Sequence, residues 1–283
     1  MFADVGGGTI RDVSLSNATV TSSGGIAGAL VGQDAGTVSA SHVSGAITCT
    51  NTCTMGGLVG YVAGGATLLS SHASNSVTLA AAGCCSPLGG LAGWNSGTIM
   101  NSSATGAVGG GEDGGAFGGL VGYNIEGTID ASFATGSASG SHGSFVGGLV
   151  GYTVNRKRSG RIENTYATGN VSGGAESEAG GLIGEGEDFV VGSSYSAGAV
   201  GGSGYVGGFF GYPYGRFTFT TDYWDTTTSG TNNGTGVGNE SGITGETTAQ
   251  LEAGLPSGFD PTIWAENPKT NNGFPYLIAN PPQ

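Results

Sequence analysis

The sequence predicts an all-β protein, a right-handed parallel β-solenoid (β-helix) of about seven turns of ~30 residues with a C-terminal cap. Three observations predict this fold: a glycine-rich composition, a short phrase that recurs along the chain, and apolar residues that alternate with polar ones. Glycine supplies 61 of 283 residues, about three times its average share. With only 8 prolines and no glycine at every third position, a collagen helix is excluded.

The recurring phrase has five residues and is typified by Gly118-Gly-Leu-Val-Gly122. Its copies start 27 to 33 residues apart, and the length varies only between the copies. A solenoid behaves in this way when loops are inserted on one side of a turn. The central residues of the seven copies are Leu30, Leu58, Leu91, Leu120, Leu149, Leu182 and Phe209.

A second phrase follows the first, as in "GTIMNSSATGAV" from Gly97. Its apolar residues alternate with polar ones, a period of two that is typical of strands. Aligned copies produce columns of like residues, and Asn101 and Asn164 fit a short internal amide ladder. One column is apolar, namely Val38, Leu68, Ile99, Ile129, Ile162 and Val191. Another is mixed, namely His42, His72, Ser103, Phe133, Tyr166 and Tyr195.

These phrases resemble the GLUG motif, a glycine-rich repeat of secreted bacterial proteins. The resemblance covers about residues 6–215 and is strongest at 118–136 and 147–171. It implies a secreted or bacterial cell-surface location, because the motif occurs in large adhesin-like proteins and beside the catalytic domains of IgA-cleaving metallopeptidases. The zinc motif of those peptidases, H-E-x-x-H, is absent from this sequence.

The repeat region is predicted to span residues 1–215, and an aromatic-rich C-terminal cap to span 216–283. An open solenoid end exposes its core and its unpaired strand edges, so a cap is expected there. The only helix-like stretch begins near Thr247 or Thr248, either of which suits an N-cap. The large aromatic residues of the cap are Trp224, Phe259, Trp264, Phe274 and Tyr276.

The chain is acidic, with a net charge of −13. Such a charge excludes binding to nucleic acid or to an anionic membrane through a general field. No apolar run approaches the length needed for a membrane span, so no membrane insertion is expected. The first ten residues lack the features of a signal peptide and read as repeat sequence. We therefore expect the chain to be part of a larger exported polypeptide, or to begin at an artificial Met1.

The four cysteines are predicted to lie in the same variable loop of adjacent turns. Cys49 and Cys53 precede one copy of the phrase, and Cys84 and Cys85 precede the next. One or two disulfides are expected, either Cys49 to Cys53 or from turn to turn, which agrees with export. Free thiols and a four-thiolate zinc site are the alternatives.

Asp130 and Glu163 form the best candidate catalytic pair. They occupy the same outward position on neighbouring turns, which would place their carboxyls about 5 Å apart, as in retaining glycosidases. The alternative is two solvated surface carboxylates beside Arg161.

The column of His42, His72 and Ser103 suggests metal binding or nucleophilic catalysis. The aromatic residues that replace them in later turns favour packing.

Two charged segments and one threonine column are candidate binding residues. The basic segment contains Arg156, Lys157, Arg158 and Arg161, which suit an anionic glycan. The segment with Glu185, Glu187 and Asp188 has oxygen ligands for calcium, the one cofactor considered. Thr98 and Thr128 belong to an outward threonine ladder of the kind that binds ice. Its companion column is mixed, and the strand propensity of threonine also explains the ladder.

We expect a structural and adhesive role rather than an enzymatic one. Binding would use side loops and ladders rather than a pocket, with a host or neighbouring-cell surface or a glycan as the partner. The alternatives are a polysaccharide-active enzyme that uses Asp130 and Glu163, and an ice-binding protein that uses the threonine ladder.

Overall fold

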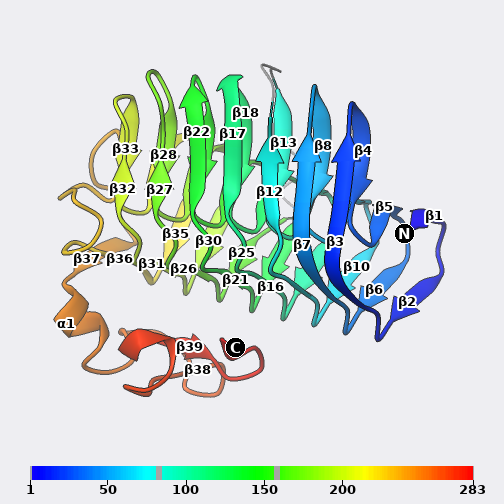
Figure 1. Ribbon diagram of the computed structural model, residues 1–283. Coiled ribbons are helices and arrows are strands. Elements are labelled where there is room, and N and C mark those ends of the chain that lie inside the picture. The colour runs from blue at the N-terminus through cyan, green and yellow to red at the C-terminus, as the bar shows by residue number, and fades with distance from the viewer. Residues whose placement is uncertain (1, 81–84, 156–159, 283) are drawn as a thin grey trace.

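The computed structural model describes residues 2–80, 85–155 and 160–282. The chain winds through four sheets, here called A, B, C and D (Figure 1). It passes sheets A, B and D once per turn, and most turns contribute two strands to sheet C. Strands of successive turns pair in parallel within each sheet. The predicted all-β parallel solenoid of about seven turns is confirmed, and its handedness stays a prediction.

The strands of each sheet stack from turn to turn. Sheet A contains β1 (Phe2–Val5), β5 (Val31–Asp34), β9 (Val59–Val62), β14 (Ala92–Asn95), β19 (Val121–Ile125), β24 (Val150–Val154), β29 (Ile183–Glu187) and β34 (Phe210–Tyr214). Sheet B contains β2 (Thr9–Arg11), β6 (Thr37–Ser39), β10 (Thr67–Leu69), β15 (Thr98–Met100), β20 (Thr128–Asp130), β25 (Ile162–Glu163), β30 (Val190–Gly192) and β35 (Thr218–Thr220). Sheet D contains β4 (Gly25–Gly28), β8 (Cys53–Gly56), β13 (Ser86–Gly89), β18 (Gly115–Gly118), β23 (Phe145–Gly147), β28 (Glu178–Gly180) and β33 (Tyr205–Gly207).

Sheet C has two arms that share its long first strands, β3 (Ser14–Ser22) and β7 (His42–Cys49). One arm continues through β11 (His72–Ala73), β16 (Ser103–Ala104), β21 (Phe133–Ala134), β26 (Tyr166–Ala167), β31 (Tyr195–Ser196), β36 (Asp222–Asp225) and β37 (Ile243–Glu246). The other continues through β12 (Ser76–Leu79), β17 (Val108–Asp113), β22 (Ala138–His142), β27 (Val171–Ser172) and β32 (Val200–Gly201).

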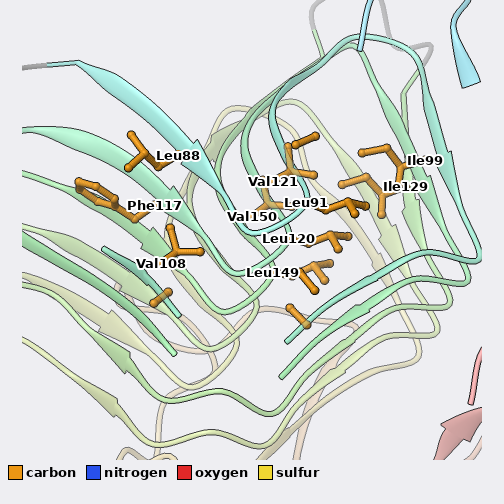
Figure 2. Packing of buried hydrophobic residues seen from close by; sticks show 14 of the residues in the cluster. Leu88, Leu91, Ile99, Val108, Phe117, Leu120, Val121, Ile129, Leu149 and Val150 are labelled. Atoms are coloured by element: carbon orange, nitrogen blue, oxygen red, sulfur yellow. The ribbon is translucent and has the colours of Figure 1, made fainter. Parts of the chain in front are cut away.

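The predicted columns are confirmed as ladders in register. Ile99 pairs with Ile129, and Ile129 with Ile162, so like residues stack inside the coil. Leu91, Leu120 and Leu149 lie at the corner between sheets D and A and point into the same interior (Figure 2). The core is thus a thin apolar column that runs the length of the molecule.

The glycines of the five-residue phrase are explained by close backbone approach. A Cβ atom at Gly118 would overlap the carbonyl oxygen of Val121, where the chain turns from sheet D into sheet A. A Cβ atom at Gly122 would lie 2.6 Å from the backbone nitrogen of Leu88 in the preceding turn. Only glycine therefore fits where sheets A and D cross.

Polar ladders lie at the corners. The serines between sheets B and C are buried. The hydroxyl oxygens of Ser71, Ser102 and Ser132 each accept a hydrogen bond of 3.1–3.2 Å from the backbone N–H of the equivalent residue one turn earlier. The expected amide ladder of Asn101 and Asn164 is not formed, because they lie two turns apart with Ala131 at the corner position between them, and Asn164 donates to Asp130. A buried amide ladder exists instead between Asn95 and Asn124, at 2.8 Å.

The C-terminal region has two parts. Residues 216–246 continue the coil through β35, β36 and β37 and lie against the last turn, where the N–H groups of Gly208 and Phe209 donate to the backbone of Asn233 and Gly234. Residues 247–282 then turn back along the outside of sheet C (Figure 1). This segment contains α1 (Thr248–Leu251), β38 (Trp264–Ala265), η1 (Asn271–Gly273) and β39 (Tyr276–Leu277).

The N-cap of α1 is Thr247, one of the two candidates, and a capping box joins it to Gln250. Within the described residues, no helix has the length and apolar character of a membrane span.

Candidate functional site

An exposed ladder of aromatic rings follows the outer face of sheet A. Tyr61, Trp94, Tyr123 and Tyr152 stand three residues after the phrase leucine on four successive turns, and their strands pair in register. Neighbouring ring centroids are 5.4–5.9 Å apart, with edge-to-face angles of 62–78°. All four rings are half-buried, so each keeps part of its surface in solvent. We call these four residues the sheet A ladder.

The next turn breaks this aromatic pattern with two carboxylates. Glu185 takes the place of the ring in sheet A, between Tyr152 and Tyr212. Glu178 takes the matching place in sheet D, between Phe145 and Tyr205. We call Glu178 and Glu185 the carboxylate pair.

Aromatic rings flank the carboxylate pair on both sides. Phe145 and Tyr152 lie on the preceding turn with ring centroids 5.4 Å apart. Tyr205 and Tyr212 lie on the following turn with ring centroids 4.5 Å apart. The two aromatic pairs are separated by two strand spacings, about 9.6 Å. A fifth ring, that of Tyr214, brings its hydroxyl to within 2.9 Å of the hydroxyl of Tyr152 across the intervening strand.

The surroundings of the carboxylate pair disfavour negative charge. Burial, and to a smaller extent the charge of Glu178, raises the pKa of Glu185 to about 7. Burial also raises the pKa of Glu178. Burial raises the pKa of Tyr214, as do its hydrogen bond with Tyr152 and the charges of Glu185 and Glu187. The site therefore concentrates negative charge that water solvates poorly.

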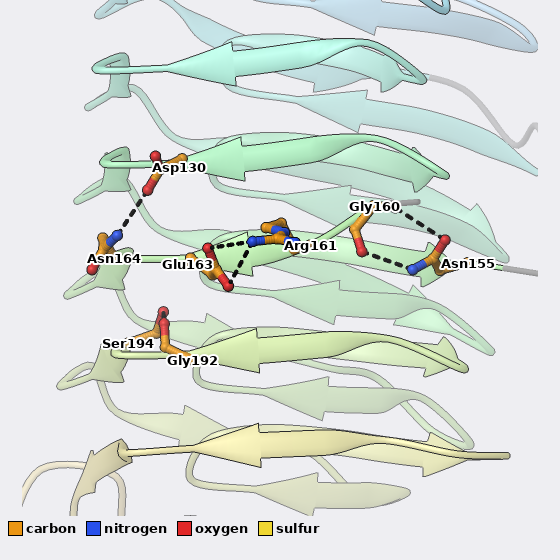
Figure 3. Close-up of polar contacts among 8 residues, drawn as sticks. All are labelled: Asp130, Asn155, Gly160, Arg161, Glu163, Asn164, Gly192 and Ser194. Atoms are coloured by element: carbon orange, nitrogen blue, oxygen red, sulfur yellow. Dashed lines mark hydrogen bonds and ion pairs between the residues drawn. The ribbon is translucent and has the colours of Figure 1, made fainter. Parts of the chain in front are cut away.

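Asp130 and Glu163 do share one position on neighbouring turns, as predicted. Each carboxylate, however, is turned to a different partner (Figure 3). Asp130 accepts a hydrogen bond of 2.9 Å from the side-chain amide of Asn164. Glu163 forms an ion pair of 3.3 Å with Arg161. The two groups are thus held as parts of two separate surface contacts.

The basic segment is only partly described. Arg156, Lys157 and Arg158 lie outside the described residues. Asn155 closes the base of this loop, because its side chain exchanges hydrogen bonds of 2.7 and 3.1 Å with the backbone of Gly160 (Figure 3). Arg161 directly precedes β25 of sheet B and forms an ion pair with Glu163.

The acidic residues proposed for calcium are divided between two roles. Glu185 and Glu187 extend outward from β29, whereas Asp188 occupies a left-handed corner and accepts a hydrogen bond from the backbone N–H of Arg216. Within residues 2–80, 85–155 and 160–282, no three His, Cys, Asp or Glu side chains are grouped as metal ligands.

The structure places Cys49 and Cys53 in a disulfide, with Cα atoms 6.0 Å apart. It joins the end of β7 to the start of β8 and closes the loop between sheets C and D. Cys84 lies outside the described residues, and Cys85 is exposed.

The threonine ladder is in the predicted register, with Thr98 paired to Thr128. Its companion column includes Leu69, Met100 and Asp130, so this face of sheet B is chemically mixed.

His42 and His72 lie in a groove on the outer side of sheet C, with a volume of about 420 Å³. The ring centroids of His42 and His72 are 4.9 Å apart, and Nδ1 of His72 is 2.7 Å from Oγ of Ser103. Burial, and then the charge of His42, lowers the pKa of His72 to about 4. His72 is therefore neutral at pH 7 and hydrogen-bonded to the next turn. Further along this column, Phe133, Tyr166 and Tyr195 are buried, as packing requires.

Reasoning from the sequence did not identify the sheet A ladder or the carboxylate pair. The signal was present three residues after each phrase leucine, where an aromatic residue follows Gly60, Gly93, Gly122, Gly151 and Gly211. Gln33 and Glu185 interrupt this series and conceal it.

Comparison with protein families gives a match. The family model described as the GLUG motif matches residues 88–109 and 143–172. Both stretches contain the end of a sheet D strand, the corner leucine and a strand of sheet A, so the motif corresponds to a structural unit of the coil. No curated protein matches the chain. The chain therefore carries the GLUG motif and is a structural repeat protein built as a parallel β-solenoid.

Proposed function

We propose that this chain is an adhesive segment of an exported, surface-associated protein, and that it binds carbohydrate through the sheet A ladder. The observation that carries the proposal is the run of four outward, half-exposed rings at a regular spacing. Tyrosine and tryptophan supply large contact areas at little cost in side-chain entropy, and they dominate binding surfaces. The apolar face of a sugar ring packs on such side chains.

The repeat supports this role in a second way. Each of the four turns of the ladder presents an aromatic ring one strand spacing from the last, so a polymeric ligand can contact several rings at once. Weak contacts to single sugars then add to a useful avidity without a deep pocket. The Cys49–Cys53 disulfide supports an exported location, because disulfides persist in oxidising compartments.

A glycan array with the purified chain tests the proposal. We expect selective, saturable binding that is the same with calcium and with a chelator. Trp94→Ala should lower the affinity at least about tenfold, since aromatic residues are the usual hot spots. Thr98→Ala is the matched control, because Thr98 is a half-buried outward residue of the same turn on sheet B. A blank array, or equal binding by wild type and Trp94→Ala, would overturn the proposal.

A further inference from the structure

We propose that the carboxylate pair selects glycans that carry protonated amino groups, and that its ligands are amino-sugar polymers. This inference rests on the proposed function and names the class of sugar. It starts from one juxtaposition: Glu178 and Glu185 lie on one turn, and aromatic pairs lie on the turns before and after it.

The flanking rings make this site different from an ordinary acidic surface. The two ring pairs lie on the strands before and after the carboxylates, about 9.6 Å apart, so a group bound at the carboxylates has rings on both sides. An ammonium group bound there would lie within about 6 Å of ring faces, the range in which rings attract cations. The carbons next to the nitrogen would contact the rings. Carboxylates and rings together therefore suit an organic ammonium group.

The electrostatics of the pair favour the same ligand. Burial raises the pKa values of Glu178 and Glu185, and the charge of Glu178 adds to the rise at Glu185, so their ionised forms have a poor environment in the free protein. A bound cation would relieve both effects. The same strand carries Glu187, which adds negative charge near Tyr214. The net charge of −13 attracts cationic polymers over a longer range.

A calcium ion fits this site less well. Calcium takes six to eight oxygen ligands, about 2.3–2.6 Å away. The carboxylate pair supplies two carboxyl groups, and its neighbours in register are the carbon rings of Phe145, Tyr152, Tyr205 and Tyr212. Carbon-rich surroundings stabilise an alkylammonium group and contribute nothing to a hard metal ion.

The position of the pair along the molecule points to a polymer. Tyr152 belongs both to the sheet A ladder and to the ring pair beside Glu185. A chain of sugars that lies on the ladder would therefore reach the carboxylates without leaving the face. One ammonium group would bind the pair while other sugars contact Trp94 and Tyr123.

Isothermal titration of the whole chain with three hexasaccharides tests this inference. The probes are a glucosamine hexamer, its N-acetylated form and a neutral glucose hexamer, at pH 6.5. We expect the glucosamine hexamer to bind at least about tenfold more tightly than the N-acetylated form. Glu185→Gln and Glu178→Gln should each remove most of this preference and leave the affinity for the N-acetylated hexamer unchanged. Asp130→Asn, which changes one outward carboxylate on sheet B, should keep the preference.

A permanently charged probe supplies an independent readout. The N-trimethylated hexamer keeps its charge at every pH, so any pH dependence must come from the protein. Its affinity should fall several-fold from pH 8 to pH 5 as Glu185 takes up a proton. The other titratable groups beside Glu185 are Glu178, Glu187, Tyr152, Tyr205, Tyr212 and Tyr214. Glu185→Gln should flatten this profile.

Three outcomes separate this inference from the proposed function. If the wild type binds charged and neutral hexamers equally, the inference is wrong and the proposed function stands. The same holds if Glu185→Gln and Glu178→Gln retain the preference. If none of the hexamers binds and Trp94→Ala changes nothing on the array, both proposals are wrong.

Discussion

Two aromatic ladders follow the outside of this solenoid, and only one of them is covered. On sheet C, Phe133, Tyr166 and Tyr195 stack face to face, with ring centroids 4.7 and 5.2 Å apart and interplanar angles of 4–5°. On sheet A, the rings of Trp94 and its neighbours meet edge to face and remain half-exposed. A column with one aromatic ring per turn therefore packs against the C-terminal segment on sheet C. On sheet A a similar column stays uncovered and is a candidate binding surface.

The covering segment is fixed to its ladder by specific contacts. Trp264 packs on Tyr166 and Tyr195, with ring centroids 6.1 and 5.9 Å away. The hydroxyl of Tyr195 donates a hydrogen bond of 2.6 Å to the carbonyl of Pro275. The hydroxyl of Tyr223 donates one of 2.7 Å to the carbonyl of Ser257. Specific contacts therefore hold residues 247–282 against sheet C.

The largest expected difference between the ladders is in stability. Trp264→Ala should cost about 3–5 kcal/mol, because it removes a fully buried ring from the cluster over sheet C. The half-exposed Trp94 should cost much less when changed to alanine, roughly 1 kcal/mol. Chemical denaturation measures both changes, and limited proteolysis should cut Trp264→Ala first within residues 247–283. Equal losses for the two variants would contradict the comparison.

The hydroxyl groups of the covered ladder sharpen the comparison. The hydroxyl of Tyr166 is buried and has no hydrogen-bond partner, whereas that of Tyr195 has two. Tyr166→Phe should therefore raise the free energy of unfolding, by about 1 kcal/mol, and Tyr195→Phe should lower it by about 1–2 kcal/mol. Denaturant unfolding of the two single variants distinguishes them, and a loss of stability in Tyr166→Phe would argue against this account.

The carboxylate pair should make the sheet A face sensitive to pH. The pKa of Glu185 is raised from 4.5 to about 7, so folding favours its protonated form. The resulting stabilisation is complete below pH 4.5 and is lost as the pH rises to about 7. Solvent screening at this partly exposed site limits it to roughly 1 kcal/mol. Unfolding measured across this range should show a flatter profile for Glu185→Gln than for the wild type.

The uncovered end of the sheet C column should show the opposite sign and a smaller effect. The pKa of His72 is lowered from 6.5 to about 4, so folding favours the neutral ring. Its contribution is present above pH 6.5 and is lost as the pH falls toward 4. His72→Gln should reduce this loss, which we expect to be less than about 1 kcal/mol. An unchanged acid profile in that variant would mean that His72 is not responsible.

The sequence predicted the regular part of the fold because periodicity encodes it directly. The columns that contain Ile99, Leu120 and Val108 followed from aligned phrases, and each is a ladder in the structure. Contacts between distant segments leave no such trace. The packing of Trp264 on Tyr166 joins residues far apart in the chain, and no local pattern indicates that residues 247–282 turn back along sheet C.

The candidate site was harder to predict for a related reason. The carboxylate pair is a break in a pattern, and a break can be recognised only after the pattern is known. The repeat register placed Asp130 and Glu163 at one position of neighbouring turns, which predicted a pair. Their contacts with Asn164 and Arg161 cannot be predicted from the sequence. The register was predictable, whereas the orientation of each side chain was not.

The constant rise of the coil makes this molecule a ruler. Every turn advances by about 4.8 Å, and each outward position is repeated once per turn. The distance between a charged group and an aromatic group on sheet A is therefore set by counting turns. Exchanging the outward residues of the turn that contains Glu185 with those of the turn before it would move the negative charge by one strand spacing along the coil. The inward residues of the core would stay unchanged. Ligand spacing in such a protein can be edited in whole steps.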